Sequence, residues 1–332
     1  MIKYPILSLL LLLPSCVSVS TTSLPTLDVQ AIIGSNDLAL YNSVDFKKKI
    51  TKLYPDLSEG TIEQAIEELY EEGKGVCLVI NINKIVNDQP ITKPYQHVQN
   101  LNEGQQMASI PAIIKDEEFR SSTGFLISEN KVLTARHVVE RANFDELRFI
   151  FDYNLSSDEA SLVYNGFTGV MEEVSPEQVY KASSIVALGK GSVETKLSTD
   201  WCVIELDRPV SNAKILEISR KSVQKNMRLS MIGHPDGMPM TIAMKGKVLK
   251  ELRDREGGIE GGKSYRCSLD SFHGNSGSPV FSFPEIELIG LYVAGKKKDF
   301  KNGNLYKYPE ESENILQSFI PIHHLKDMIN NL

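Results

Sequence analysis

From residue 107 onward, the chain consists of short apolar runs separated by turn-forming residues, and no long helical pattern interrupts them. Runs of this length predict strands, and many short strands at regular spacing indicate an all-β barrel or sandwich. The predicted strands lie at Ile110–Ile114, Thr123–Ile127, Val132–Leu133, Leu147–Phe151, Ser184–Leu188, Trp201–Leu206, Leu229–Ile232, Ser264–Leu269, Leu288–Val293 and Gln317–Ile320.

A glycine-rich turn at residues 272–280, Phe-His-Gly-Asn-Ser-Gly-Ser-Pro-Val, holds the strongest candidate nucleophile. Glycine at position 274 permits backbone angles that a residue with a Cβ resists, so the turn can expose the hydroxyl of Ser276. It can also aim the backbone N–H groups of Gly274 and Ser276 at one point. A hydroxyl beside two such donors suits acyl transfer, whereas an ordinary Gly/Ser/Pro turn is the alternative interpretation.

A histidine and a carboxylate lie upstream of this turn, each next to a predicted strand. His137 stands in the segment Leu-Thr-Ala-Arg-His-Val-Val that follows one apolar run. Asp200 directly precedes another, where a carboxylate would be desolvated unless it had a partner. These residues predict that Ser276 attacks a carbonyl carbon, His137 acts as general base and Asp200 orients the imidazole.

Several unrelated folds carry a catalytic triad of Ser, His and Asp, and they differ in the order of these residues along the chain. The order His, Asp, Ser is that of one of these folds. With these three segments, residues 100–325 resemble the trypsin-like serine proteases of the chymotrypsin fold. The turn around Ser276 and the segment around His137 are similar to those of bacterial glutamyl endopeptidases. Asp200 matches the family's pattern of an aspartate before apolar residues, which Glu205 and Asp207 do not.

The resemblance implies a mainly β fold of two antiparallel six-stranded barrels, chymotrypsin-like. The pattern of the residues before them predicts a small helical N-terminal extension. His137 and Asp200 would come from the first barrel and Ser276 from the second. The implied activity is hydrolysis of peptide bonds in a polypeptide substrate through an acyl-enzyme intermediate, without a cofactor or metal. The backbone N–H groups of Gly274 and Ser276 would form the oxyanion hole.

Four residues are expected to contact the substrate. Asp270 stands six residues before Ser276, where an acid in trypsin-like enzymes selects Arg or Lys, although it would serve equally well to cap the turn. Tyr292 occupies the place of a histidine in glutamyl endopeptidases, which counts against glutamate specificity. Val293 to Gly295 would pair with an extended substrate as an added strand.

Two alternatives to a constitutively active enzyme exist. One is a catalytically silent, protease-like binding module, which the complete set of three residues argues against. The other is an enzyme kept latent by its N-terminal extension. Asn275 stands where animal trypsins have an aspartate that pairs with a newly cut N-terminus. The resemblance therefore implies that no such cut is needed for activity.

The N-terminus is typical of an exported protein. Lys3 precedes a short apolar run, and a small residue and Cys16 follow it, so residues 1–15 are predicted to be a signal peptide. The pattern resembles a bacterial lipoprotein signal, in which Cys16 carries a lipid and residues 16–27 form a tether. A plain secretory signal is the alternative. The predicted location is the cell envelope, anchored to the membrane by that lipid, or otherwise the periplasm or medium.

Residues 28–95 are predicted to form the helical extension, and residues 96–332 the protease domain. Within the extension, the spacing of Ile62, Ile66 and Leu69 predicts a helix over residues 58–72, with Ser58 as its cap. A buried strand is expected directly after it, at residues 76–80.

Charge and cysteine content argue against a nucleic-acid-binding protein and against a metal site made of cysteines. The net charge of −7 and the lack of a long basic run argue against nucleic-acid binding. Apart from Cys16, the chain has three cysteines without metal-binding spacing, and they are expected to be buried thiols. His323 and His324 precede an amphipathic tail and are not expected to bind a metal.

Overall fold

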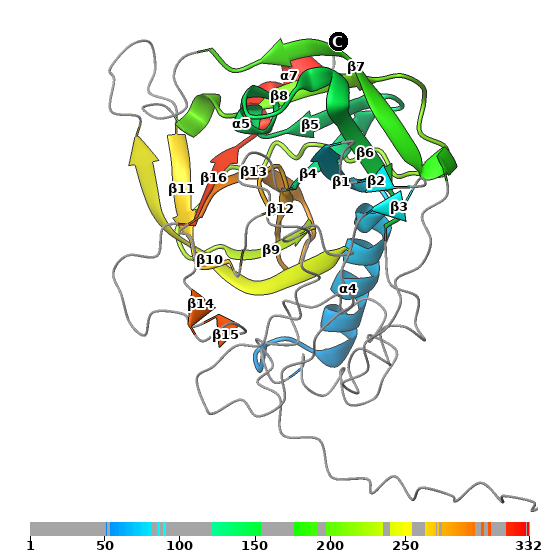
Figure 1. Cartoon of the computed structure of the whole chain (residues 1–332). Coiled ribbons are helices and arrows are strands. Elements are labelled where there is room, and N and C mark those ends of the chain that lie inside the picture. The colour runs from blue at the N-terminus through cyan, green and yellow to red at the C-terminus, as the bar shows by residue number, and fades with distance from the viewer. Residues whose placement is uncertain are drawn as a thin grey trace, which may run out of the picture.

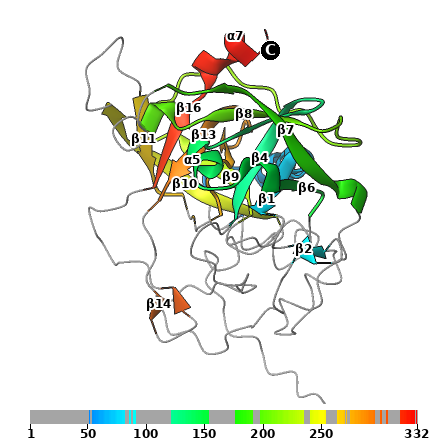
Figure 2. The ribbon, with the colours of Figure 1, turned by 45° about the horizontal axis from the view of Figure 1, so that its top comes forward.

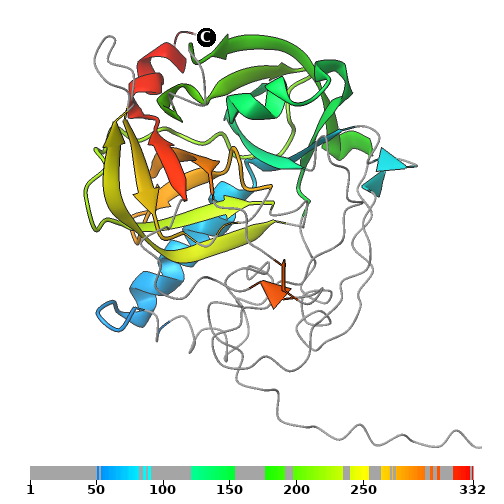
Figure 3. The same cartoon turned by 60° about the vertical axis from the view of Figure 1, so that its left-hand side comes forward.

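The computed structural model contains two closed β-barrels that lie side by side (Figure 3). All strand pairs within them are antiparallel. The predicted pair of antiparallel six-stranded barrels is therefore confirmed. The structure describes residues 51, 54–81, 85–86, 89–90, 121–153, 176–190, 197–234, 240–253, 263–269, 271, 274–295, 300–301, 305–306, 317–329 and 331.

In the first barrel the strands follow the order β1–β4–β5–β8–β7–β6, and β6 pairs with β1 to close the ring. The predicted strand at Ile110–Ile114 lies outside the described residues. The strands of this barrel are β1 (Val76–Asn81), β4 (Ser122–Ser128), β5 (Lys131–Thr134), β6 (Leu147–Phe151), β7 (Val179–Leu188) and β8 (Cys202–Leu206).

The second barrel has the strand order β10–β11–β16–β13–β12–β9, and β9 pairs with β10 to close it. Its strands are β9 (Arg228–Gly233), β10 (Thr241–Arg253), β11 (Lys263–Cys267), β12 (Pro279–Ser282), β13 (Leu288–Ala294) and β16 (Ser318–Pro321). Two short hairpins pair β2 (Ile85–Val86) with β3 (Gln89–Pro90) and β14 (Phe300–Lys301) with β15 (Leu305–Tyr306).

The described helices are short, except for α4. Figure 1 shows α4 next to the second barrel, and Figure 2 shows α7 at the far end of the chain, beyond β16. The α-helices are α4 (Glu59–Gly73), α5 (Arg136–Glu140) and α7 (Lys326–Ile329), and the 3₁₀ turns are η2 (Phe144–Glu146), η3 (Pro176–Gln178), η4 (Leu197–Thr199) and η6 (His323–Leu325).

Helix α4 forms where the sequence predicted it, with the predicted cap. The hydroxyl of Ser58 accepts a hydrogen bond from the backbone N–H of Thr61 at 3.1 Å, and the helix ends at Gly73. An N-cap of this kind satisfies one of the free N–H groups at the start of a helix. The buried face consists of Ile62, Ala65, Ile66, Leu69 and Gly73.

The segment before α4 binds the second barrel. The ring of Tyr54 stacks on Phe283 with 4.5 Å between the ring centroids. The carboxylate of Asp56 accepts a hydrogen bond from the guanidinium of Arg228, at the start of β9, at 2.6 Å. This hydrogen bond lowers the pKa of Asp56 below its ordinary value.

The end of α4 contacts both the second barrel and the chain that links the barrels. A Cβ added at Gly73 would lie 2.7 Å from the sulfur of Met240, so this helix residue packs directly on the second barrel. Glu72 pairs with Lys214 of the linking segment at 3.3 Å. Burial nevertheless raises the pKa of Glu72, because desolvation outweighs the attraction of Lys214.

Strand β1 follows α4 after a short turn and is wholly buried. Because β1 pairs with both β4 and β6, a segment assigned to the N-terminal extension supplies one strand of the first barrel. The predicted boundary at residue 96 lies outside the described residues, as do residues 1–50, which include the signal peptide and tether.

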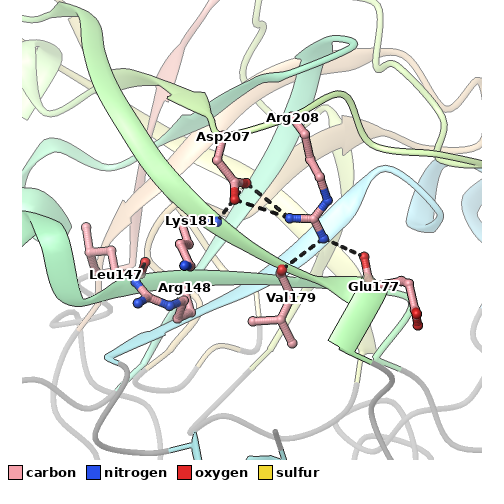
Figure 4. A network of polar contacts seen from close by, with 7 residues as sticks. All are labelled: Leu147, Arg148, Glu177, Val179, Lys181, Asp207 and Arg208. Atoms are coloured by element: carbon pink, nitrogen blue, oxygen red, sulfur yellow. Dashed lines mark hydrogen bonds and ion pairs between the residues drawn. The ribbon is translucent and has the colours of Figure 1, made fainter.

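A polar network anchors the start of β7 to the end of β8 (Figure 4). Arg208 donates hydrogen bonds to the carbonyl oxygens of Glu177 and Val179 at 2.9 and 3.1 Å. Its guanidinium also pairs with Asp207 and lies 3.9 Å from the centroid of the Tyr180 ring. A planar cation suits stacking and multiple hydrogen bonds at once, so Arg208 fixes where β7 begins.

Candidate active site

His137 and Asp200 meet at the end of the first barrel. His137 lies in α5, directly after β5, and Asp200 directly precedes Trp201 and β8. The Nδ1 atom of His137 is 2.7 Å from Oδ2 of Asp200, and the backbone N–H of His137 donates to Oδ1 at 2.9 Å. Both carboxylate oxygens therefore bind the same histidine residue.

This pairing fixes the imidazole in one orientation. Asp200 is buried, with 4% of its side chain exposed, while 14% of the His137 side chain remains exposed. A carboxylate that accepts from Nδ1–H selects the tautomer with its lone pair on Nε2. The histidine can therefore take up a proton at Nε2, and the aspartate can stabilise the imidazolium that results.

The turn that carries Ser276 depends on two glycines with positive φ. Gly274 has a φ of 92° and Gly277 a φ of 90°, values that residues with a Cβ rarely adopt. At Gly277 an added Cβ would also lie only 1.9 Å from the carbonyl oxygen of Thr123. The sequence pattern Gly-Asn-Ser-Gly thus corresponds to a turn that needs glycine at both positions, with Ser276 between the two positive-φ residues.

Thr123 in β4 joins this turn to the first barrel. Its N–H donates to the carbonyl of Ser276 at 2.8 Å, and its hydroxyl donates to the carbonyl of Gly274 at 2.8 Å. The same hydroxyl accepts from the N–H of His234 at 3.0 Å, and the carbonyl of Thr123 accepts from the Thr134 hydroxyl at 2.7 Å. The position of the serine turn relative to β4 and β5 is set by these bonds.

Within the turn, the backbone N–H groups divide into two sets. Those of Gly277 and Ser278 donate to the carbonyls of Tyr292 and Asn275, at 2.8 and 3.0 Å. Among the described residues, no acceptor is bonded to the N–H groups of Gly274 or Ser276. Asn275 is buried, and its side-chain oxygen is 3.5 Å from the Ser278 hydroxyl.

The predicted substrate-contacting residues on β13 lie beside the serine turn. Tyr292 is bonded to Gly277 and Ser278 through its backbone, and Val293 follows it in the same strand. Gly295 is exposed at the end of β13. Asp270 and the lipidation candidate Cys16 lie outside the described residues.

Sequence reasoning missed two residues of this region. Thr123 was noted only as the start of a strand, and Ser271 was not singled out. Ser271 is buried, and its hydroxyl is 2.5 Å from the hydroxyl of Tyr292. The position of Ser271, five residues before Ser276, was the available signal, since the chain there runs towards the nucleophile.

No cysteine in the described part of the chain is a competing nucleophile. Cys77, Cys202 and Cys267 are free and buried, as predicted. Burial raises the pKa of Cys202 and of Cys267 to about 12, and it raises the pKa of Cys77 as well. Because the thiolate is the reactive form, these groups are inert at neutral pH.

The described residues contain neither a candidate metal-binding cluster nor a helix suited to crossing a membrane. Across the barrels and the segments around them, no three His, Cys, Asp or Glu side chains cluster in a way that could hold a metal ion. No helix there is both long and apolar enough to cross a membrane.

Residues 122–291, more than half of the 332-residue chain, match the sequence profile of the trypsin-like peptidase domain. The chain belongs to this family. The matched region runs from β4 through most of β13, so it contains His137, Asp200 and Ser276. Trypsin-like peptidase domains are thus similar to this chain in the part that holds the candidate site.

Curated relatives include glutamyl endopeptidases of Staphylococcus epidermidis, one of them from strain ATCC 12228. Both are 26% identical to this chain over 193 residues, which is 58% of this chain and 60% of the relative. The chain therefore matches less than two thirds of the length of these relatives.

Among solved structures, the Rv3671c protease of M. tuberculosis is similar in an inactive, serine-to-alanine mutant form, with a TM-score of 0.44 and 11% identity. That match covers 79% of this chain and 90% of the other. The active form of the same protease has a TM-score of 0.42 and 13% identity and covers 76% and 78%.

Proposed function

We propose that this trypsin-like peptidase domain is a serine endopeptidase with Ser276 as nucleophile, His137 as general base and Asp200 as its orienting acid. The observation that carries the proposal is the double hydrogen bond between His137 and Asp200. A buried carboxylate held in this way has a partner for both oxygens and gives the imidazole one defined tautomer. Family membership supports the assignment.

In the proposed reaction, the Ser276 hydroxyl adds to the carbonyl carbon of the scissile peptide bond, and its proton passes to Nε2 of His137. The imidazolium then gives this proton to the leaving amine, so the C–N bond breaks and an acyl-enzyme remains. Water attacks the ester by the same route and regenerates Ser276. Asp200 remains ionised and stabilises the charged histidine.

The oxyanion that forms during each attack needs hydrogen-bond donors. We assign this role to the backbone N–H groups of Gly274 and Ser276, which have no acceptor among the described residues. Loss of one such donor typically costs about 3 kcal/mol of transition-state stabilisation. The edge formed by Val293 to Gly295 is proposed to hold the substrate as an added strand.

Hydrolysis of fluorescently labelled casein by the full chain tests this function. We expect turnover by the wild type and a loss of about 10⁴-fold or more in Ser276→Ala, because the nucleophile acts as a unit with its base. Ser282→Ala, a buried serine of β12 in the same barrel, is the matched control and should retain turnover. A folded wild type without hydrolysis, or equal turnover in Ser276→Ala, would contradict the proposal.

We also propose that the protein is exported to the cell envelope and anchored by a lipid on Cys16. The charged start, short apolar run and cysteine of residues 1–16 support this assignment. Cells that express the full chain should incorporate an alkyne-tagged fatty acid into it, and Cys16→Ser should abolish the incorporation. Tagging that persists in Cys16→Ser would rule out this anchor, and a wild type without the tag would favour a plain secretory signal.

A further inference from the structure

Tyr292 lies in β13, directly beside the turn that carries Ser276. Its N–H donates to the carbonyl of Ser278 at 2.9 Å and its carbonyl accepts from Gly277 at 2.8 Å, so β13 runs directly beside the serine turn. A substrate strand added beside Val293 to Gly295 must place the residue whose carbonyl is attacked, P1, next to Ser276. In that arrangement the P1 side chain would enter between β13 and Ser271, where the Tyr292 hydroxyl contacts the Ser271 hydroxyl.

The side chain of Tyr292 spans this space. Its hydroxyl is 2.5 Å from the Ser271 hydroxyl, and both residues are only 2% exposed. A Cβ added at Gly295 would lie 2.3 Å from the Tyr292 hydroxyl oxygen and 3.4 Å from Oγ of Ser271. The tip of the tyrosine therefore reaches across from its own strand to Ser271 and lies against the exposed backbone of Gly295.

The core of the second barrel holds the ring in this position. Tyr292 belongs to the buried apolar cluster that includes Cys267, Phe319 and Val248. Packed interiors of this kind leave few alternative rotamers for a large side chain. A substrate would have to displace a buried ring from this cluster in order to extend a long side chain past Tyr292.

We infer that Tyr292 closes the P1 pocket and restricts cleavage to bonds after small residues, namely Gly, Ala and Ser. This inference rests on the proposed peptidase function and names its substrate class. A long P1 side chain would have to break the hydrogen bond between the two hydroxyls and displace a packed ring. A P1 carboxylate would also lose water where it meets the hydroxyls of Tyr292 and Ser271, which is costly for a charge.

A peptide library cleaved by the full chain, with products identified by mass spectrometry, tests the inference. The wild type should cleave after Gly, Ala and Ser. Tyr292→Val should extend cleavage to Leu, Phe and Lys, with kcat/KM for these residues raised on the order of 100-fold, as expected when a pocket gains room. Tyr292→Leu, which keeps the core better filled, provides the same comparison if the valine variant does not fold.

The matched control is Tyr265→Val. Tyr265 is a buried tyrosine of the same barrel, and its hydroxyl donates to Glu251 and not to Ser271. The Tyr265→Val variant should therefore keep the wild-type P1 preference. Each variant is also treated with a fluorophosphonate, which reports an assembled nucleophile whatever the P1 preference.

Wild-type cleavage after Lys, Arg, Glu or Phe would overturn the inference but leave the peptidase function intact. An unchanged preference in both Tyr292 variants, or labelling without cleavage in the wild type and both variants, would also overturn it. Absence of both labelling and cleavage in every folded protein would instead refute the proposed function, and the inference with it.

Discussion

Thr123 shows how one side chain can connect the two halves of a site. Its hydroxyl donates to the carbonyl of Gly274 and accepts from the N–H of His234, so both hydrogen bonds of this hydroxyl go to the second barrel or its connections. The residue itself is wholly buried in β4 of the first barrel. In a buried setting, a hydroxyl with both roles filled also specifies the position of its partners.

Replacement of Thr123 by valine should therefore affect the serine turn more than the fold. The change keeps the shape but leaves the carbonyl of Gly274 and the N–H of His234 without this partner, at about 1–3 kcal/mol each. We expect a lower midpoint in thermal unfolding, and a casein hydrolysis rate that falls further than the loss of folded protein explains.

Thr241→Val is the control for this prediction. Thr241 is also buried, and its hydroxyl donates to the carbonyl of Gly233 at 3.3 Å rather than to the serine turn. If both valine variants lose stability and activity in the same proportion, Thr123 has no specific role in positioning Ser276.

At the scale of single elements, α4 is part of the packed structure. Its buried face belongs to the same apolar cluster as Val76 of the first barrel and Ile232 of the second. Such a helix gains most of its stability from tertiary packing, since it is too short to be stable alone. The N-terminal extension thus contributes a helix that packs on both barrels.

Leu69, which is wholly buried in α4, provides the test of this role. Leu69→Ala should lower the free energy of unfolding by about 2–5 kcal/mol, through the lost burial and the cavity that remains. The urea midpoint measures this change. Glu67→Ala on the exposed face should alter stability by no more than about 0.5 kcal/mol. Equal midpoints for both variants would show that α4 does not pack on the barrels in solution.

The sequence predicted those elements whose pattern is local. Helix α4 carries its own cap and apolar spacing, and β6 coincides with the apolar run at residues 147–151. Strand β10 was not predicted, because its lysines and a register shift between Val248 and Lys250 interrupt any regular alternation. Closure of each barrel depends on contacts between distant segments, and family resemblance supplied that part of the prediction.

The residues of the candidate site likewise fall into those that a local sequence pattern predicts and those that depend on contacts between distant segments. Gly274, Ser276 and Gly277 form a recognisable local motif, and the strand context of His137 and Asp200 is also local. The contacts made by Thr123, Ser271 and Tyr292 come from different parts of the chain, so no window of sequence contains them.

At the scale of the whole molecule, the proposed reaction requires residues from two barrels to act as one site. His137 and Asp200 come from the end of the first barrel, and Ser276 comes from a turn of the second that Thr123 bonds to the first. If these residues act together, a change in Asp200 must alter the chemistry of Ser276, although the two belong to different barrels.

The most direct measurement is the rate at which a fluorophosphonate modifies the full chain, with the adduct located by mass spectrometry. We expect an adduct on Ser276 in the wild type. In Asp200→Asn the histidine should take the wrong tautomer, and labelling should slow by about 10⁴-fold while circular dichroism stays unchanged. An adduct on another residue, or labelling of Asp200→Asn at the wild-type rate, would contradict the central claim.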